Sequence, residues 1–211
     1  MPSWCGSLNR ALYRGGRQRG GTELEMQERP EIEDLDESAV IVTIGEVEPA
    51  VAGHRRYLDI ASSWGVPAHV TVLYPFVRPR SLDDTVIERL GAAINSVPSF
   101  DCTFSRCDWF DDEVLWLAPE PDQGFRDLTA AVFREFPDTP PYGGNVEHPI
   151  PHLTVGDRTR IPVPPAALRA AEVNVTRQLP IATRVERALL MAGAQRVSSW
   201  SSIREFSLGD L

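Results

Sequence analysis

The chain has 211 residues, 42% of them hydrophobic and 24% charged, which suits one large globular domain or two small lobes that share a core. Its formal charge of −9 disfavours tight binding of long nucleic acid, because such binding needs a positive surface, but small ligands with few phosphates remain compatible. All 21 basic residues are arginine. The chain therefore cannot perform chemistry that requires a lysine, such as ATP-dependent ligation, P-loop phosphate transfer or Schiff-base formation.

Targeting signals and cysteines point to the cytoplasm. No apolar run approaches the roughly 20 residues that a membrane-spanning helix needs. Residues 1–21 are rich in Gly, Arg and Ser and lack the apolar segment of a secretory signal. Cys102 and Cys107 are separated by an odd offset, which places them on opposite faces of a regular strand and favours neither a disulfide nor a metal pair. We therefore expect a cytoplasmic protein without membrane contact.

The first 37 residues differ in composition from the rest of the chain. Residues 1–20 carry four Arg and no acid, whereas residues 23–37 carry eight acids and one Arg. Large apolar groups are few, so residues 1–37 are predicted to be a disordered leader before one folded domain at 38–211. An Arg-Gly run in the leader is compatible with RNA contact, but a solvated tail is the simpler interpretation.

Apolar periodicity predicts the elements of the folded domain. In chain order they are a strand at 39–44, a helix at 48–62, a strand at 68–74, a helix at 81–94, strands at 100–110 and 114–117, a helix at 123–136, a strand at 152–155, a helix at 165–175, and an antiparallel strand pair at 183–191 and 197–206. Ser81 is the expected N-cap of the second helix. This order predicts an α+β fold rather than a doubly wound parallel sheet.

Two His-x-Thr motifs lie in predicted strands, as His69-Val70-Thr71 and His152-Leu153-Thr154. Because side chains alternate along a strand, the His and Thr of each motif share one face about 6–7 Å apart. The apolar neighbours share the opposite face and are expected to pack against helices. The same alternation places Tyr74 on the packed face.

This arrangement suits chemistry at a phosphate. Two imidazoles on opposite sides of a phosphate can act as general base and general acid, because the unperturbed histidine pKa near 6.5 allows one neutral and one protonated ring. The threonine hydroxyls can donate hydrogen bonds to non-bridging phosphate oxygens. Such a site requires no metal and no lysine.

The segments His69–Phe76 (HVTVLYPF) and Pro151–Gly156 (PHLTVG) resemble the two signatures of the 2H phosphoesterases, and in particular the bacterial 2′-5′ RNA ligase and cyclic-nucleotide phosphodiesterase branch. The resemblance covers about residues 39–206. It implies a bilobal α+β fold, in which two pseudo-symmetric lobes with antiparallel sheets and flanking helices surround a central cleft.

The resemblance also implies a function and its site residues. It implies metal-independent action, without a cofactor, on 2′,3′-cyclic phosphate or 2′-5′ phosphodiester bonds, and ligation is the reverse of such a reaction. His69 and His152 would be the acid–base pair, and Thr71 and Thr154 the phosphate ligands. We expect a monomer that takes a small nucleotide or an RNA end as substrate. A non-catalytic module that binds nucleotides or RNA ends in the same cleft is the alternative.

Phe76, Tyr142 and His148 are candidate substrate contacts. Phe76 follows the first motif and can stack on a base. Tyr142 and His148 belong to the Pro/Gly-rich loop before the second motif. A zinc site on His148 and His152 at helical spacing is disfavoured, because the two prolines between them prevent a helix.

The remaining candidates are arginines and aromatic residues near the motifs. Four arginines follow the motifs and can add positive charge near the cleft: Arg78, Arg80, Arg158 and Arg160. His54, in the cluster His54-Arg55-Arg56, is expected at a solvated helix position, and a phosphate-sensing role of the cluster is the alternative. Three tryptophans are expected in the core rather than at a ligand: Trp109, Trp116 and Trp200.

Overall fold

The computed structural model describes residues 35–210, so most of the predicted leader, residues 1–37, lies outside the described residues. The last residues of the predicted leader, from residue 35 onward, belong to the folded domain. The Asp36 N–H donates to the carbonyl of Gly193 over 3.0 Å, and Glu37 begins the first strand. No helix within the described range has the length and apolar character needed to cross a membrane.

Eight strands form one antiparallel sheet with the order β6-β3-β4-β5-β2-β1-β7-β8. The strands are β1 (Glu37–Thr43), β2 (His69–Leu73), β3 (Phe100–Phe110), β4 (Val114–Glu120), β5 (Leu153–Asp157), β6 (Ile181–Val185), β7 (Arg187–Gly193) and β8 (Ser201–Ser207). The helices are α1 (Glu48–Leu58), α2 (Ile60–Ser63), α3 (Asp84–Asn95), α4 (Gln123–Glu135) and α5 (Pro165–Thr176), with short 3₁₀ turns at Pro79–Ser81 and Pro141–Gly144. The predicted α+β class is confirmed.

The two His-x-Thr strands are neighbours at the centre of this sheet. Val70 of β2 pairs with Leu153 of β5, and this contact joins two four-stranded halves. A single residue, Glu186, separates the edge strand β6 from β7 in the other half, so the sheet curls and brings its two ends together. The two predicted sheets are therefore the halves of one curled sheet.

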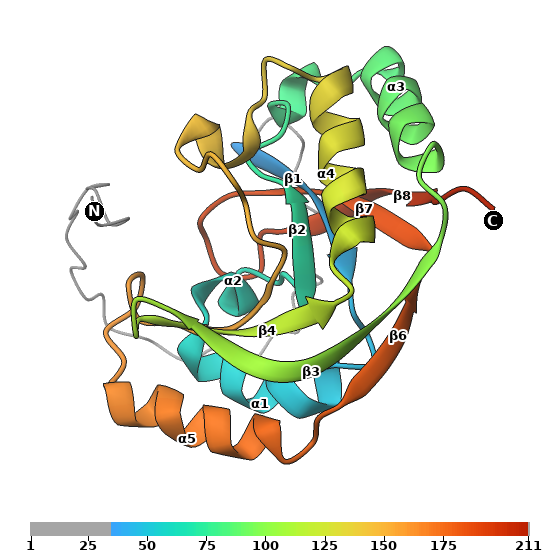
Figure 1. Cartoon of the computed structure of the whole chain (residues 1–211). Coiled ribbons are helices and arrows are strands. Elements are labelled where there is room, and N and C mark those ends of the chain that lie inside the picture. The colour runs from blue at the N-terminus through green and yellow to red at the C-terminus, as the bar shows by residue number, and fades with distance from the viewer. Residues whose placement is uncertain (1–34, 211) are drawn as a thin grey trace, which may run out of the picture.

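Each half of the sheet is covered by a helix that follows a strand of the other half. Helix α1 follows β1 but packs against β5, and α4 follows β4 but packs against β2. Helix α5 completes the layer beside α1, and α3 completes the layer beside α4 (Figure 1). At Gly156 in β5 a Cβ would meet Leu168 Cδ2 at 2.4 Å and Leu58 Cβ at 2.8 Å, so only glycine permits this close packing against α1 and α5.

Several predicted elements have different boundaries. The strand predicted at 197–206 begins at Ser201, and the strand predicted at 114–117 extends to Glu120. The helix predicted at 48–62 breaks at Asp59, whose extended backbone and side chain begin α2. Helix α3 is capped by Asp83, which accepts from the Val86 N–H, and not by Ser81. The strand predicted at 183–191 is two strands, β6 and β7, in opposite halves of the sheet.

The cysteine geometry predicted for β3 is wrong. The pairing of β3 with β4 shifts register between Phe104 and Arg106, which marks a β-bulge. A bulge reverses the alternation of side chains beyond it. Cys102 and Cys107 therefore both pack against the main core instead of facing opposite sides, and both are free thiols.

Candidate active site

The central strand pair brings the two motifs together. With Val70 opposite Leu153, the antiparallel register places His69 beside Thr154, and Thr71 beside His152. These four polar side chains lie on the face away from α1 and α4 and line one pocket of about 260 Å³, to which α2 contributes Ala61. Each histidine thus stands next to the threonine of the other motif, and the site is complete only when both halves are in place.

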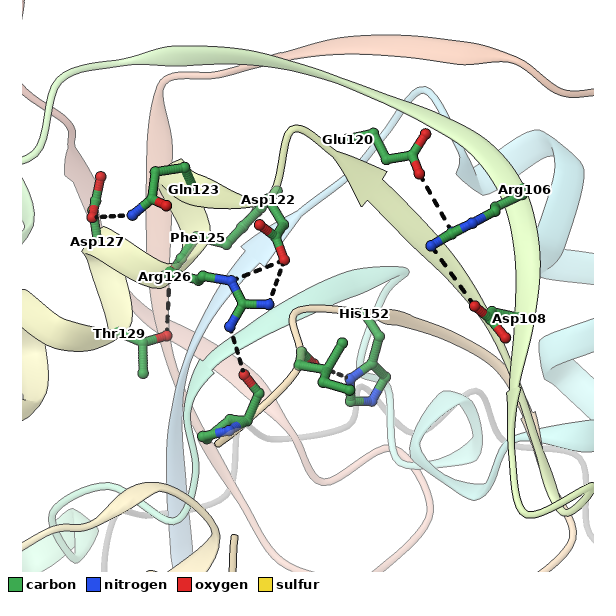
Figure 2. A network of polar contacts seen from close by, with 12 residues as sticks. Arg106, Asp108, Glu120, Asp122, Gln123, Phe125, Arg126, Asp127, Thr129 and His152 are labelled. Carbon is green, nitrogen blue, oxygen red and sulfur yellow. Dashed lines mark hydrogen bonds and ion pairs between the residues drawn. The ribbon is translucent and has the colours of Figure 1, made fainter. Parts of the chain in front are cut away.

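Each imidazole is oriented by a hydrogen bond to the backbone carbonyl two residues before it. His69 Nδ1 lies 2.8 Å from the carbonyl oxygen of Pro67, and His152 Nδ1 lies 2.7 Å from that of Ile150 (Figure 2). A carbonyl only accepts hydrogen bonds, so Nδ1 carries the proton in each ring. This tautomer leaves Nε2 of both rings available for proton transfer in the pocket.

The electrostatic surroundings of the two histidines differ. Burial and then the nearby Arg55 lower the pKa of His69 from 6.5 to about 4, although Asp59 opposes this shift. Burial also lowers the pKa of His152, but there the Asp157 carboxylate favours the protonated ring. His69 is therefore a neutral base over a wide pH range, and His152 has the surroundings that better support a proton.

A buried ion pair behind His69 was not anticipated from the sequence. Arg55, which follows His54, is only 1% exposed, and its Nη2 lies 2.8 Å from Asp59 Oδ2. The same guanidinium donates to the carbonyl of Val66, next to the turn that holds the His69 ring. The available signal was helical spacing, because Arg55 follows the buried Val51 by four residues and precedes Asp59 by four.

Aromatic rings flank the second motif. The His152 ring meets the edges of Phe110 and Trp116 at centroid distances of 5.0 and 5.9 Å, and these two rings stack on each other at 4.7 Å. Trp116 is buried, as predicted. Its contact with His152 was not predicted and helps to fix the imidazole.

An apolar wall lies beside the first motif and contains Tyr74. A small buried cluster of Ala39, Ile41, Trp64, Val66, Met191 and Trp200 lines the pocket and is separate from the main core. Tyr74 joins this wall, contrary to the prediction, because a register shift in the pairing of β1 with β2 leaves Val72 as an extra residue. Leu73 then enters the core and Tyr74 faces the pocket. The Tyr74 hydroxyl donates to Glu37 Oε2 over 2.9 Å.

Tyr142 lies against Thr71. Its backbone has φ of +53°, and its N–H donates to the carbonyl of Tyr74 over 2.6 Å. Its phenol shares a hydrogen bond with the Thr71 hydroxyl, and burial raises the pKa of Tyr142 to about 12. Tyr142 lines both the motif pocket and a second pocket of about 370 Å³. Tyr142, a predicted substrate contact, therefore lies in the motif pocket beside Thr71.

The other two candidate contacts lie elsewhere. Phe76 does not line the motif pocket: it is buried in the main core, where its ring meets Phe136 edge-on at 4.9 Å. His148 lines the second pocket, between α4 and the loop before the second motif. Arg126 of α4 borders this pocket too and connects Asp122 to the carbonyl of Pro149 (Figure 2).

The arginines that follow the second motif have different positions. Arg158 approaches Glu113, with Nη1 3.7 Å from Oε1. Arg160 lines the motif pocket, and its guanidinium carbon lies 4.9 Å from the centroid of the Trp64 ring. Within residues 35–210, no group of three or more His, Cys, Asp or Glu side chains is placed to hold a metal ion.

Comparison with known proteins agrees with this geometry. The structure is similar to that of E. coli LigT in its apo form, with 14% identity, coverage of 84% of this chain and 99% of LigT, and a TM-score of 0.52. It is also similar to TT0787 of Thermus thermophilus, with 16% identity, coverage of 82% and 98%, and a TM-score of 0.59. These similarities show a shared fold. A search among curated proteins finds no match.

The family follows from the sequence itself. The model of the 2′-5′ RNA ligase superfamily matches residues 42–195, a range that includes both His-x-Thr strands and the helices that cover them. The predicted relationship to the 2H phosphoesterases is thereby confirmed. The chain belongs to the 2′-5′ RNA ligase superfamily.

Proposed function

We propose that the chain is a metal-independent phosphoesterase that acts on 2′,3′-cyclic phosphate or 2′-5′ phosphodiester bonds of nucleotides or RNA ends. The supporting observation is the composite site, in which each motif histidine stands beside the threonine of the other motif in one pocket. Structures of the similar E. coli LigT with phosphate and with 3′-AMP are consistent with a nucleotide substrate for this fold.

In the proposed hydrolysis, His69 Nε2 takes a proton from a water molecule as the water oxygen attacks phosphorus. His152, protonated at Nε2, gives its proton to the departing ribose oxygen as the bond between phosphorus and that oxygen breaks. Thr71 and Thr154 donate hydrogen bonds to the non-bridging oxygens and hold phosphorus in line with attack. The assignment of base to His69 rests on its lower pKa and on the cationic Arg55 nearby.

Ligation follows the same path with a different nucleophile. A ribose hydroxyl replaces water as the nucleophile at a 2′,3′-cyclic phosphate, and the product is a phosphodiester. We further propose that the protein acts as a cytoplasmic monomer on small nucleotides or RNA ends and does not bind long nucleic acid. The net charge of −9 supports the last point.

The test uses 2′,3′-cyclic nucleotides and 2′-5′-linked dinucleotides with the His69→Ala and His152→Ala variants. Each substitution is expected to lower kcat/KM by about 10²- to 10⁴-fold, as loss of a general acid or base does. His54→Ala is the matched control, because His54 lies on α1 and does not line the pocket. EDTA is expected to leave activity unchanged.

Two outcomes would contradict the proposal. Full activity of either motif variant would exclude the proposed acid–base roles of His69 and His152. Loss of activity in EDTA would indicate that the reaction requires a metal. Saturable nucleotide binding without turnover of any substrate would instead favour the non-catalytic binding module.

A further inference from the structure

Arg160 occupies a defined position at one end of the motif pocket. It belongs to the turn after β5, which is closed by Asp157: Oδ1 of this residue accepts from the Thr159 N–H over 2.8 Å and from the Thr159 hydroxyl over 2.5 Å. The guanidinium of Arg160 lies over the buried Trp64 ring, 4.9 Å from its centroid. A cation held on an aromatic face keeps its hydrogen-bond donors free for a ligand.

Arg160 is also the positive charge that the pocket presents. It is the only arginine among the described residues that line this pocket, and no carboxylate in residues 35–210 forms an ion pair with it. The positive charge of Arg55 is compensated by Asp59. Both motif histidines have lowered pKa values and are neutral in the free protein near pH 7. Two carboxylates line the pocket as well, but Asp59 pairs with Arg55 and Asp157 accepts its hydrogen bonds from Thr159. Arg160 is therefore the cation on the pocket lining that is available to a ligand anion.

The backbone of Arg160 lies beyond the second motif along the chain. A strand advances about 3.3 Å per residue, so Asp157 lies roughly 10 Å beyond Thr154 along β5, and Arg160 follows in the next turn. The reacting phosphorus must lie among the two motif histidines and threonines. The apolar cluster that contains Trp64 and Trp200 lines the same pocket.

We propose that Arg160, held on Trp64, binds a second phosphate group of the substrate. The preferred substrates are then nucleotides that carry another phosphate besides the reacting one, such as 5′-phosphorylated nucleoside 2′,3′-cyclic phosphates. The sugar and base occupy the apolar part of the pocket. The inference rests on the proposed function, because it takes the reacting phosphate to lie at the two motifs.

The test compares adenosine 2′,3′-cyclic phosphate with its 5′-phosphorylated form. The unmodified protein is expected to show about tenfold higher kcat/KM for the 5′-phosphorylated substrate, as one charge-assisted contact at a partly exposed site provides. Arg160→Gln is expected to reduce this ratio to about one, because it lowers kcat/KM mainly for the 5′-phosphorylated substrate. Arg160→Lys should retain part of the preference, because it keeps the charge without the planar stacking group.

Two arginine controls make the result specific. Arg187→Gln changes the net charge equally but lies in an exposed ion pair with Glu205, and it should preserve the full ratio. Arg126→Gln tests the second pocket as the alternative site of the extra phosphate. An unchanged ratio in Arg160→Gln, or loss of the ratio in Arg126→Gln alone, would overturn the inference.

A binding measurement separates this inference from the proposed function. Calorimetry with adenosine 2′-monophosphate and adenosine 2′,5′-bisphosphate measures the contribution of the 5′-phosphate without turnover. If neither cyclic substrate is hydrolysed, the proposed function fails, and the affinity ratio of the two ligands in the unmodified protein and in Arg160→Gln still decides the inference. Equal affinities of the unmodified protein for both ligands, or no binding of either, would overturn it.

Discussion

Arg55 donates two hydrogen bonds to one carboxylate oxygen of Asp59, from Nε over 3.1 Å and from Nη2 over 2.8 Å. The pair is buried and close enough to His69 for both charges to shift the pKa of its imidazole in opposite directions. Its net effect favours the neutral ring, because the arginine has the larger influence. The pair therefore supports the neutral form of His69 that the proposed mechanism requires of its base.

Substitutions at this pair should shift the pKa of His69 in opposite directions. Arg55→Gln removes the positive charge, so the pKa of His69 should rise, whereas Asp59→Asn removes the negative charge, so it should fall. The measurement is the acid limb of the pH profile of kcat/KM, together with an NMR titration of the imidazole. Both variants should also lose stability, by about 3–5 kcal/mol each, because each leaves a buried charge unpaired.

A purely structural role would give a different pattern. If the pair only supported the fold, both variants would lose stability without opposite displacements of the acid limb. The double variant Arg55→Gln/Asp59→Asn leaves no unpaired charge and should recover part of the lost stability. Shifts of the same sign in the two single variants would contradict the electrostatic role.

The pH profile of kcat/KM should be bell-shaped with a mildly acidic optimum. His69 must be neutral, which sets the acid limb near pH 4, and His152 must be protonated, which sets the alkaline limb below 6.5 because its pKa is lowered. In the profile of kcat the alkaline limb should move upward, because a bound phosphate anion favours the protonated ring. A sigmoidal profile without an alkaline limb would contradict the acid role of His152.

His69 should also make the fold less stable in acid. Its pKa is about 4 in the folded protein and 6.5 when unperturbed, so between these values the unfolded chain binds more protons than the folded protein. Its contribution to the free energy of unfolding is therefore present above pH 6.5 and is lost as the pH falls to about 4; it amounts to about 3 kcal/mol. Urea unfolding at several pH values should show this slope, and His69→Gln should flatten it.

The phenol of Tyr142 should contribute to catalysis through Thr71. Tyr142→Phe removes the hydrogen bond with the threonine hydroxyl, and kcat/KM is expected to fall about three- to tenfold, equivalent to one net hydrogen bond of about 0.5–1.5 kcal/mol. Tyr57→Phe is the control, because that side chain is 69% exposed. Unchanged turnover in Tyr142→Phe would show that Thr71 is positioned without it.

Two glycine-to-alanine substitutions should have opposite effects on stability. Gly156→Ala places a Cβ within 2.4 Å of Leu168 and should destabilise the protein by about 1–3 kcal/mol, with loss of activity because β5 carries the second motif. Gly53→Ala meets nothing within 4 Å and lies inside α1, so it should stabilise by about 0.5–1 kcal/mol. Denaturant titration measures both, and equal effects would contradict the packing argument.

The motif geometry was predictable because it depends on local alternation. The apolar residues on both sides of His69 and of His152 identify a strand with one packed face, and the structure places these two strands side by side. Phe100–Phe110 and α4 were likewise placed within one residue, since long periodic segments leave little choice of element.

The remaining features depend on contacts that no local pattern encodes. The register shift at Val72, which turns Tyr74 into the pocket, arises from pairing with β1 and not from the sequence of β2. The burial of Arg55 depends on its partner Asp59, because an arginine is rarely buried without one. Arg160 follows the strand in an ordinary turn, and its place beside Trp64 results from the antiparallel packing of β2 and β5.

Helix α1 packs on β5 and α4 packs on β2, so each half of the chain supplies the helix that covers the other half. This exchange resembles domain swapping between two protomers, but it occurs within one chain. A cut in the turn at residues 111–113 would leave one fragment with β2 but without its covering helix α4, and the other with β5 but without α1. In each fragment the apolar face of the motif strand would be exposed to water. The two fragments together contain all of the helix–strand contacts that cover these faces. The two halves of this chain are therefore expected to restore activity only as a non-covalent pair, and neither is a minimal enzyme.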